Sequence, residues 1–136
     1  MPNTTRSPST LLGYLLLTLC YVPVGSAEPT VFEPGAYIVD LGRTPQTEAN
    51  ALRPYGMVYE IVGERIPVSW AFSEDKVSNN EIDFVADNQA YRSSAFIIPS
   101  DFAPYAAPLV ATWRQRGVQV DGPTQNGFVA PVFGII

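Results

Sequence analysis

Histidine is absent from the 136-residue sequence, and the only cysteine is Cys20. Nucleophile pairs of the Ser-His-Asp and Cys-His kinds therefore cannot form, and the usual histidine and cysteine ligands of zinc, copper, haem and iron–sulfur sites are missing. The sequence also lacks the Gly-x-Gly-x-x-Gly and P-loop patterns, so nothing in it supports a nucleotide cofactor. The single lysine, Lys76, lies in a polar loop between Asp75 and Val77, where we expect a solvated ammonium group rather than a catalytic amine.

The first 27 residues have the three parts of an export signal. Arg6 supplies positive charge, residues 11–24 are almost wholly apolar, and Gly25-Ser26-Ala27 places small residues at positions −3 and −1 of a cut after Ala27. An uncleaved membrane anchor is the rival interpretation, but a glycine and a proline interrupt the apolar run, which is shorter than the roughly 20 residues of a spanning helix. The sequence therefore predicts a signal peptide over residues 1–27 and a secreted or cell-surface product with no membrane segment.

Removal of this signal takes away Arg6 and Cys20. The remaining 109 residues carry 7 basic and 13 acidic side chains, a formal net charge of −6, and no cysteine for a disulfide. Negative charge of this size disfavours binding to nucleic acid, whose phosphates it repels, and to anionic lipid. One compact domain is expected, because 109 residues are too few for two.

Short apolar runs indicate the strands of this domain. Residues 28–34 contain two prolines and are expected to form an extended lead-in, followed by a single domain over residues 35–136. The predicted strands are 36–41, 66–72, 95–99 and 118–121, with a further short strand or hairpin arm at 81–86.

Two helices are predicted, over residues 54–62 and 104–116. In the first, Gly63 is placed to end the helix in a left-handed conformation. The helix has one apolar stripe at the i, i+3, i+4, i+7 spacing, formed by Tyr55, Val58, Tyr59 and Val62, which we expect to pack on a sheet. Strand, helix and strand thus alternate twice, which favours a three-layer α/β fold: a mainly parallel sheet of about four to five strands with helices on its faces.

Four aspartates lie at the ends of the predicted strands or just beyond them: Asp40, Asp75, Asp101 and Asp121. In an open parallel sheet, ligands bind beyond the carboxyl ends of the strands, where these acids would converge. One hypothesis is a calcium site built from all four, and another is an acid/base pair of Asp40 with Asp101 or Asp75. The alternative is ordinary turn and capping chemistry, and no other cofactor is indicated.

Aromatic side chains suggest a different site. The candidates for a surface on which sugar rings stack are Trp70, Tyr55, Tyr59, Tyr91 and Tyr105. At their helical spacing, Tyr55 and Tyr59 are more simply explained as the buried face of the first helix. Trp70 and Tyr91 are therefore the candidate ligand-binding residues.

The chain ends on an apolar segment, residues 128–136, after a turn signal at Asn126-Gly127. We expect this segment to be an edge strand with unpaired backbone groups, which favours association. The expected partner is a protein: either a second copy of the chain or the remainder of a longer surface protein.

Several segments together resemble an uncharacterised α/β domain at the start of large secreted bacterial surface proteins, itself similar in outline to class I glutamine amidotransferase-like domains. The segments are Tyr37-Ile-Val-Asp-Leu-Gly, Leu52-Arg-Pro-Tyr-Gly-Met-Val-Tyr, Ile66-Pro-Val-Ser-Trp-Ala, Ile82-Asp-Phe and Ala95-Phe-Ile-Ile-Pro. The resemblance implies a flavodoxin-like fold and secretion. The catalytic cysteine and histidine of active amidotransferase-like enzymes match no position, so no catalytic residue is carried over.

Two functions follow as hypotheses. The leading one is a non-catalytic extracytoplasmic module that acts in binding or assembly as part of a bacterial cell-surface or secreted protein. The alternative is a carboxylate-dependent hydrolase, acting on glycans, that uses Asp40 with Asp101 or Asp75.

Overall fold

A computed structural model describes residues 25–136, so most of the predicted signal peptide lies outside the described residues. The elements, in chain order, are β1 (Glu28–Phe32), β2 (Tyr37–Asp40), α1 (Arg53–Gly63), β3 (Ser69–Ala71), β4 (Phe84–Ala86), β5 (Gln89–Tyr91), β6 (Ala95–Ile98), the 3-10 helix η1 (Ser100–Phe102), α2 (Ala103–Gln115), β7 (Val120–Asp121) and β8 (Phe128–Ile135). Neither α1 nor α2 is long and apolar enough to cross a membrane, and the same is true of every helix in residues 25–136.

Six strands form one sheet in the order β1-β8-β3-β6-β2-β7, and every neighbouring pair is antiparallel. The predicted parallel, flavodoxin-like α/β fold is therefore wrong, and so is the resemblance to amidotransferase-like domains that implied it. Residues 25–136 instead form a sheet-dominated antiparallel fold with two α-helices.

The error arises from how the two crossovers interleave. Helix α1 joins β2 to β3, which run in the same direction, but the antiparallel strand β6 lies between them. Helix α2 joins β6 to β7 in the same way, across β2. This is the split β-α-β arrangement of ferredoxin-like sheets, extended on one side by β8 and β1. Strand, helix and strand follow one another along the chain in this arrangement just as they do in a parallel α/β sheet, so the order of elements does not distinguish the two folds.

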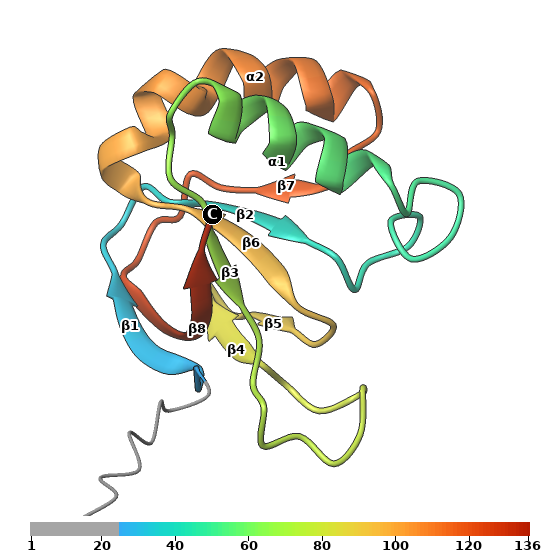
Figure 1. Ribbon diagram of the computed structural model, residues 1–136, viewed down its shortest axis with the longest axis vertical. Helices are drawn as coiled ribbons and strands as arrows, with labels where there is room; N and C mark the ends of the chain where they lie inside the picture. The colour runs from blue at the N-terminus through green and yellow to red at the C-terminus, as the bar shows by residue number, and fades with distance from the viewer. Residues whose placement is uncertain (1–24) are drawn as a thin grey trace, which may run out of the picture.

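Both faces of the central strands are covered. Helices α1 and α2 lie on one face, and the hairpin of β4 and β5 lies on the other (Figure 1). Along β2 and β6, Val39, Phe96 and Ile98 face the helices, whereas Ile38 and Ile97 face the hairpin. Central strands buried on both sides explain why these runs are continuously apolar, a pattern more typical of parallel sheets.

The final apolar segment is a strand, as predicted, but it is not an edge strand. Strand β8 pairs with β1 on one side and with β3 on the other. The expected lead-in, residues 28–34, supplies β1, with Glu28 opposite Val132 and Phe32 opposite Phe128. The edges of the sheet are instead β1, which contains Pro29, and the two-residue β7. A proline and a very short strand both limit pairing with other chains.

Helix α1 buries a different stripe from the one predicted. Its buried residues are Pro54, Met57, Val58 and Ile61, while Tyr55 and Tyr59 are 54% and 84% exposed. Both stripes have the same helical spacing, so the pattern alone did not distinguish them. The helix ends at Gly63, but the left-handed residue that follows is Arg65, at φ 63°.

The helices leave part of their side of the sheet uncovered. In the described residues, the apolar core under the helices contains no residue of β1 or β8. Trp70 lies opposite Phe96 in the register, so its side chain shares the helix-side face. Phe133 lies on the same face, next to Trp70, and the two side chains are 37% and 38% exposed.

Candidate functional site

Three aromatic side chains meet on this uncovered part of the sheet: Trp70 of β3, Phe133 of β8 and Phe72, which directly follows β3. The ring centroid of Trp70 lies 5.1 Å from that of Phe72 and 5.6 Å from that of Phe133. The Phe72 and Phe133 rings are 4.9 Å apart. We call these three residues the aromatic cluster. It forms because residues two apart on a strand share a face and because β3 and β8 are neighbours.

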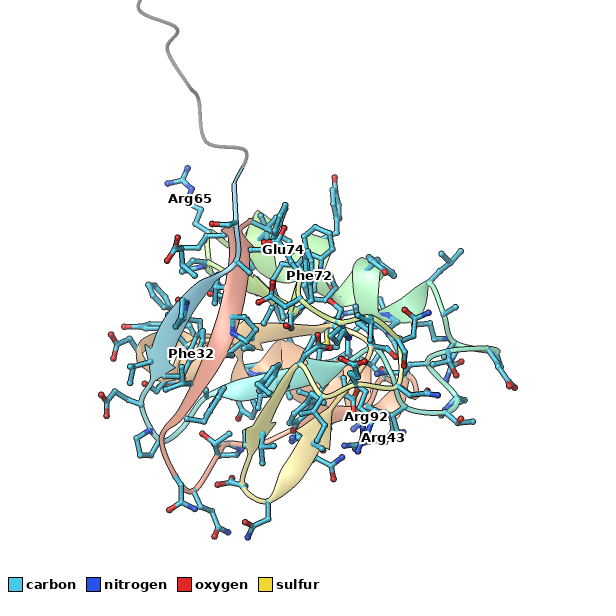
Figure 2. The ribbon with its side chains drawn as sticks, turned by 90° about the horizontal axis from the view of Figure 1, so that it is seen from below. Phe32, Arg43, Arg65, Phe72, Glu74 and Arg92 are labelled. Atoms are coloured by element: carbon cyan, nitrogen blue, oxygen red, sulfur yellow. The ribbon has the colours of Figure 1, made fainter. Side chains whose placement is uncertain are left out.

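A pocket of about 650 Å³ opens beside the aromatic cluster. Trp70 and Phe72 supply its aromatic surface, and its other lining residues are polar: Ser73, Glu74, Lys76, Asn79, Ser93 and Ser94. Figure 2 shows Phe72 and Glu74 close together, away from Arg43 and Arg92 at another corner of the molecule. Aromatic groups beside a few polar groups are typical of ligand pockets.

Asp83, just before β4, holds the walls of this pocket together. Its buried carboxylate accepts hydrogen bonds from the backbone N–H of Ser73 at 2.7 Å and of Ser94 at 2.9 Å. It also forms an ion pair with Lys76, with Nζ 2.8 Å from Oδ1. The Lys76 side chain is only 15% exposed, so the prediction of a solvated ammonium group is wrong. Its Nζ also donates to the carbonyl of Arg92.

The indole of Trp70 is fixed at the pocket wall. Its Nε1–H donates to the hydroxyl of Ser94 at 2.6 Å, and Ser94 has a left-handed backbone, with φ 73°. The ring also contacts Phe96 in the sheet, with centroids 6.5 Å apart. One face and edge of the indole are therefore held by the protein, and the side chain stays partly accessible.

The other proposed aromatic residues occupy different places. Tyr91 is 1% exposed, stacks on Phe84 with centroids 4.7 Å apart and belongs to the core under the hairpin. Tyr55, Tyr59 and Tyr105 are exposed on the two helices. Of the five candidates, only Trp70 lines the pocket.

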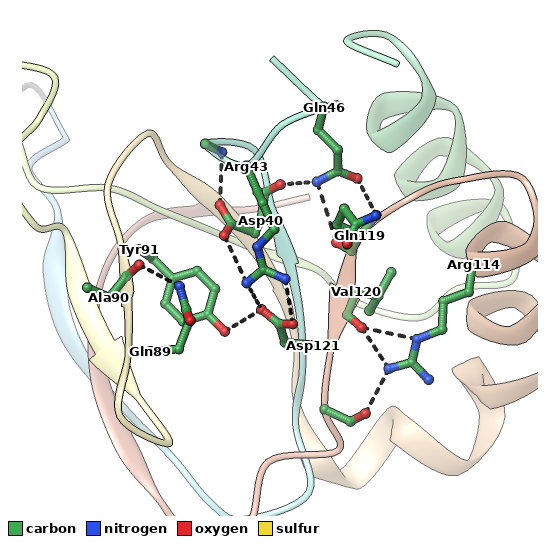
Figure 3. A network of polar contacts seen from close by, with 12 residues as sticks. Asp40, Arg43, Gln46, Gln89, Ala90, Tyr91, Arg114, Gln119, Val120 and Asp121 are labelled. Carbon is green, nitrogen blue, oxygen red and sulfur yellow. Dashed lines mark hydrogen bonds and ion pairs between the residues drawn. The ribbon is translucent and has the colours of Figure 1, made fainter. Parts of the chain in front are cut away.

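Two of the four candidate aspartates come together, bridged by an arginine (Figure 3). The guanidinium of Arg43 binds both carboxylate oxygens of Asp121, at 2.9 and 2.6 Å, and lies 3.3 Å from Oδ2 of Asp40. The hydroxyl of Tyr91 donates to Asp121 at 2.8 Å, and the N–H of Gly42 donates to Asp40 at 2.9 Å. Gln46 completes the network by bonding the carbonyl of Asp40 and the N–H of Gln119.

Burial shapes the ionisation of this network. It raises the pKa of Asp40 above its ordinary value, although the Gly42 N–H and the Arg43 charge oppose the change. Burial also raises the pKa of Tyr91, and its hydrogen bond to Asp121 adds to the effect. The bond to Asp121 raises the pKa of Arg43. Because these carboxylates are held by an arginine, a tyrosine and a backbone N–H, the arrangement is suited to fixing the loop after β2 against β7.

Asp75 and Asp101 lie apart from this network. Asp101 is exposed in η1, which follows β6. The last residue of β6, Ile98, pairs with Tyr37, and Asp40 is at the other end of β2. Asp75 is exposed in the loop between β3 and β4. Across residues 25–136, no group of three or more acidic side chains is placed to hold a metal ion. The structure therefore does not bring the four aspartates to one edge.

Comparisons with protein-family models, with curated proteins and with solved structures find no match for this chain. Sequence reasoning named Trp70 but missed Phe72, Phe133 and Asp83. The spacing of Trp70 and Phe72, two residues apart in a strand, placed them on one face, but nothing local indicated that this face is uncovered.

Proposed function

We propose that this protein is a non-catalytic binding module that acts outside the cytoplasm, in a secreted or cell-surface setting, and that it binds its ligand through the aromatic cluster and the adjoining pocket. The observation that carries the proposal is the partial exposure of Trp70 and Phe133 on an uncovered sheet face. Aromatic side chains gathered at the surface beside a polar pocket are a common basis for recognition.

The polar groups of the pocket support binding rather than catalysis. The buried carboxylate of Asp83 is already paired with Lys76 and two backbone N–H groups, so it is not available as a general base. In the other polar cluster, Arg43 engages both Asp40 and Asp121. A hydrolase built on Asp40 and Asp101 is disfavoured because Asp40 lies at one end of the paired strands β2 and β6, whereas Asp101 follows their other end.

The extracytoplasmic setting is supported by the predicted signal peptide. The cut predicted after Ala27 immediately precedes β1, so the sheet keeps all its strands in the exported product. The exported chain has no cysteine and needs no disulfide, and its core is formed by apolar packing on both faces of the sheet.

Retention on the cell surface tests this proposal. Fluorescently labelled exported protein is added to intact cells of the producing organism, and the bound fraction is compared among the wild type, Trp70→Ala and the matched control Tyr59→Ala. Tyr59 is an exposed aromatic residue of α1 that does not line the pocket. We expect Trp70→Ala to weaken retention about tenfold or more, as for the loss of a central aromatic contact, and Tyr59→Ala to leave it unchanged. Equal retention of all three proteins, or no retention of the wild type, contradicts the proposal.

A further inference from the structure

We propose that the pocket beside the aromatic cluster binds a neutral oligosaccharide. This inference rests on the proposed function, because it names the ligand class of the same site. It follows from the combination of ring faces, hydrogen-bonding groups, charge and rigidity that the pocket presents.

The aromatic side chains provide two inclined surfaces. The rings of Trp70 and Phe72 are tilted by 54° with centroids 5.1 Å apart, and Phe133 stands nearly edge-on to Trp70 at 77°. A sugar ring has an apolar face of C–H groups and an edge of hydroxyl groups. The apolar face gains by covering an exposed aromatic ring, and a volume of about 650 Å³ admits a short stretch of sugar chain.

Hydrogen-bonding side chains surround these rings. Ser73, Asn79 and Ser93 carry hydroxyl and amide groups that both donate and accept. Glu74 adds a carboxylate, of which one oxygen accepts a hydrogen bond from the N–H of Ala27 at 2.6 Å. This mixture suits the hydroxyl edge of a sugar. An apolar peptide segment is a poorer fit, because it would cover these polar groups without replacing their hydrogen bonds to water.

The charges in the pocket favour a neutral ligand. Among the described residues that line it, Lys76 alone is basic, and its charge is already paired with buried Asp83. Glu74 is the remaining charged lining residue, and the chain as a whole carries more acidic than basic groups. Among the lining side chains, an anionic ligand would therefore meet the Glu74 carboxylate and no unpaired basic group.

The pocket is held in shape before a ligand arrives. Asp83 ties Ser73, Lys76 and Ser94 together, and Ser94 in turn fixes the indole of Trp70. Walls fixed in this way lower the entropy that a ligand has to offset when it orders the loops around it.

Tryptophan fluorescence offers a direct test with the exported protein. The chain has two tryptophans, Trp70 and Trp113, and Trp113 packs on α1 away from the pocket. In Trp113→Phe, Trp70 is the only tryptophan. We titrate this variant with cellohexaose, xylohexaose, maltohexaose and the hexamer of N-acetylglucosamine, and confirm binding to the wild type by calorimetry. We expect at least one of them to change the Trp70 emission saturably, with a dissociation constant below about 1 mM.

Further variants separate the possible outcomes. Trp70→Leu should weaken sugar binding about tenfold or more, and Asn79→Ala by about threefold to tenfold, while Tyr59→Ala should leave it unchanged. Unchanged thermal melting shows that the variants fold. If none of the four sugars binds at about 10 mM, or if Trp70→Leu leaves the dissociation constant unchanged, the inference is overturned. If surface retention still depends on Trp70 in that case, the ligand is of another class, such as a protein, and the proposed function stands. If surface retention does not depend on Trp70 either, both the inference and the proposed function fail.

Discussion

Lys76 and Asp83 form an ion pair in which Nζ of the lysine lies 2.8 Å from Oδ1 of the aspartate, and the Asp83 side chain is fully buried. The pair joins the loop after β3 to the residue just before β4, within the long connection between β3 and β6 that carries the hairpin. Asp83 also accepts hydrogen bonds from Ser73 and Ser94. The pocket wall and the hairpin are thus held by one carboxylate.

Asp83→Ala should destabilise the protein by about 3–5 kcal/mol, because it leaves a largely buried ammonium group and two backbone N–H groups without their acceptor. Lys76→Met should cost less, because the carboxylate keeps both N–H donors. Urea denaturation of the two variants measures the difference. A loss for Lys76→Met as large as that for Asp83→Ala would show that the ion pair, rather than the hydrogen bonds to the loops, dominates.

Asp40 predicts a pH dependence with a definite sign. Burial raises its pKa above the ordinary value of 3.8. Because its pKa is raised, the folded protein binds the Asp40 proton more tightly than the unfolded chain does. The stabilisation from this proton is fully present below the unfolded pKa and is lost as the pH rises through the folded pKa. Asp40→Asn does not titrate, so the stability of the wild type relative to this variant should fall as the pH rises from below 3.8 through the raised folded pKa. Urea denaturation across this range checks it, and a rise would contradict the assigned cause.

Asp87 predicts the opposite sign. Its pKa is lowered, chiefly by the N–H of Gln125 and then by Asn126, which donate to it from the loop between β7 and β8. Its stabilising effect is present above its unfolded pKa and is lost as the pH falls through the lower folded pKa. Asp87→Asn should therefore lower the melting temperature at neutral pH and have little effect at about pH 2. Asparagine suits this turn position, where φ is 45°, so the hairpin itself should remain.

The exported protein should begin at Glu28. A cut after Ala27 leaves β1 whole and keeps all five of its residue pairs with β8. Mass spectrometry of the product recovered from the cell envelope or the medium gives its first residue. Detection of residues 11–24 in that product would refute the predicted processing.

The orientation of α1 is tested by a matched pair of substitutions. Ile61→Ala should destabilise the protein by about 2–5 kcal/mol, because Ile61 is fully buried under the helix. Tyr59→Ala should change the stability by no more than about 0.5 kcal/mol, because its side chain is 84% exposed. If Tyr59→Ala were the costlier change, the stripe predicted from the sequence would be the buried one.

Local signals in the sequence were sufficient to locate most elements. The apolar run at residues 95–99 became β6, and the segment at 104–116 became α2, which is followed by Gly117 with a positive φ of 91°. These outcomes depend on the conformational preferences of neighbouring residues, which a single segment already expresses.

The candidate site was only partly predictable. Trp70 was identified because an aromatic residue in a short strand is a candidate for stacking. Tyr91 was a candidate ligand-binding residue as well, but it is buried under the hairpin. Lys76 was misread because its partner Asp83 lies seven positions away across a loop. No periodic pattern specifies which acidic side chain a loop lysine will meet.

The sequence by itself determined where both helices and most of the strands form, because backbone preference and apolar spacing act within a few residues. The tertiary structure alone decided the direction of β6 relative to β2, the two neighbours of β8 and the exposure of Trp70 and Phe133. Each of these depends on contacts between segments far apart in the chain, and the apolar stripes involved fit more than one arrangement. What separates the arrangements is which surfaces two short helices can cover on a six-stranded sheet, and here they leave the aromatic cluster open.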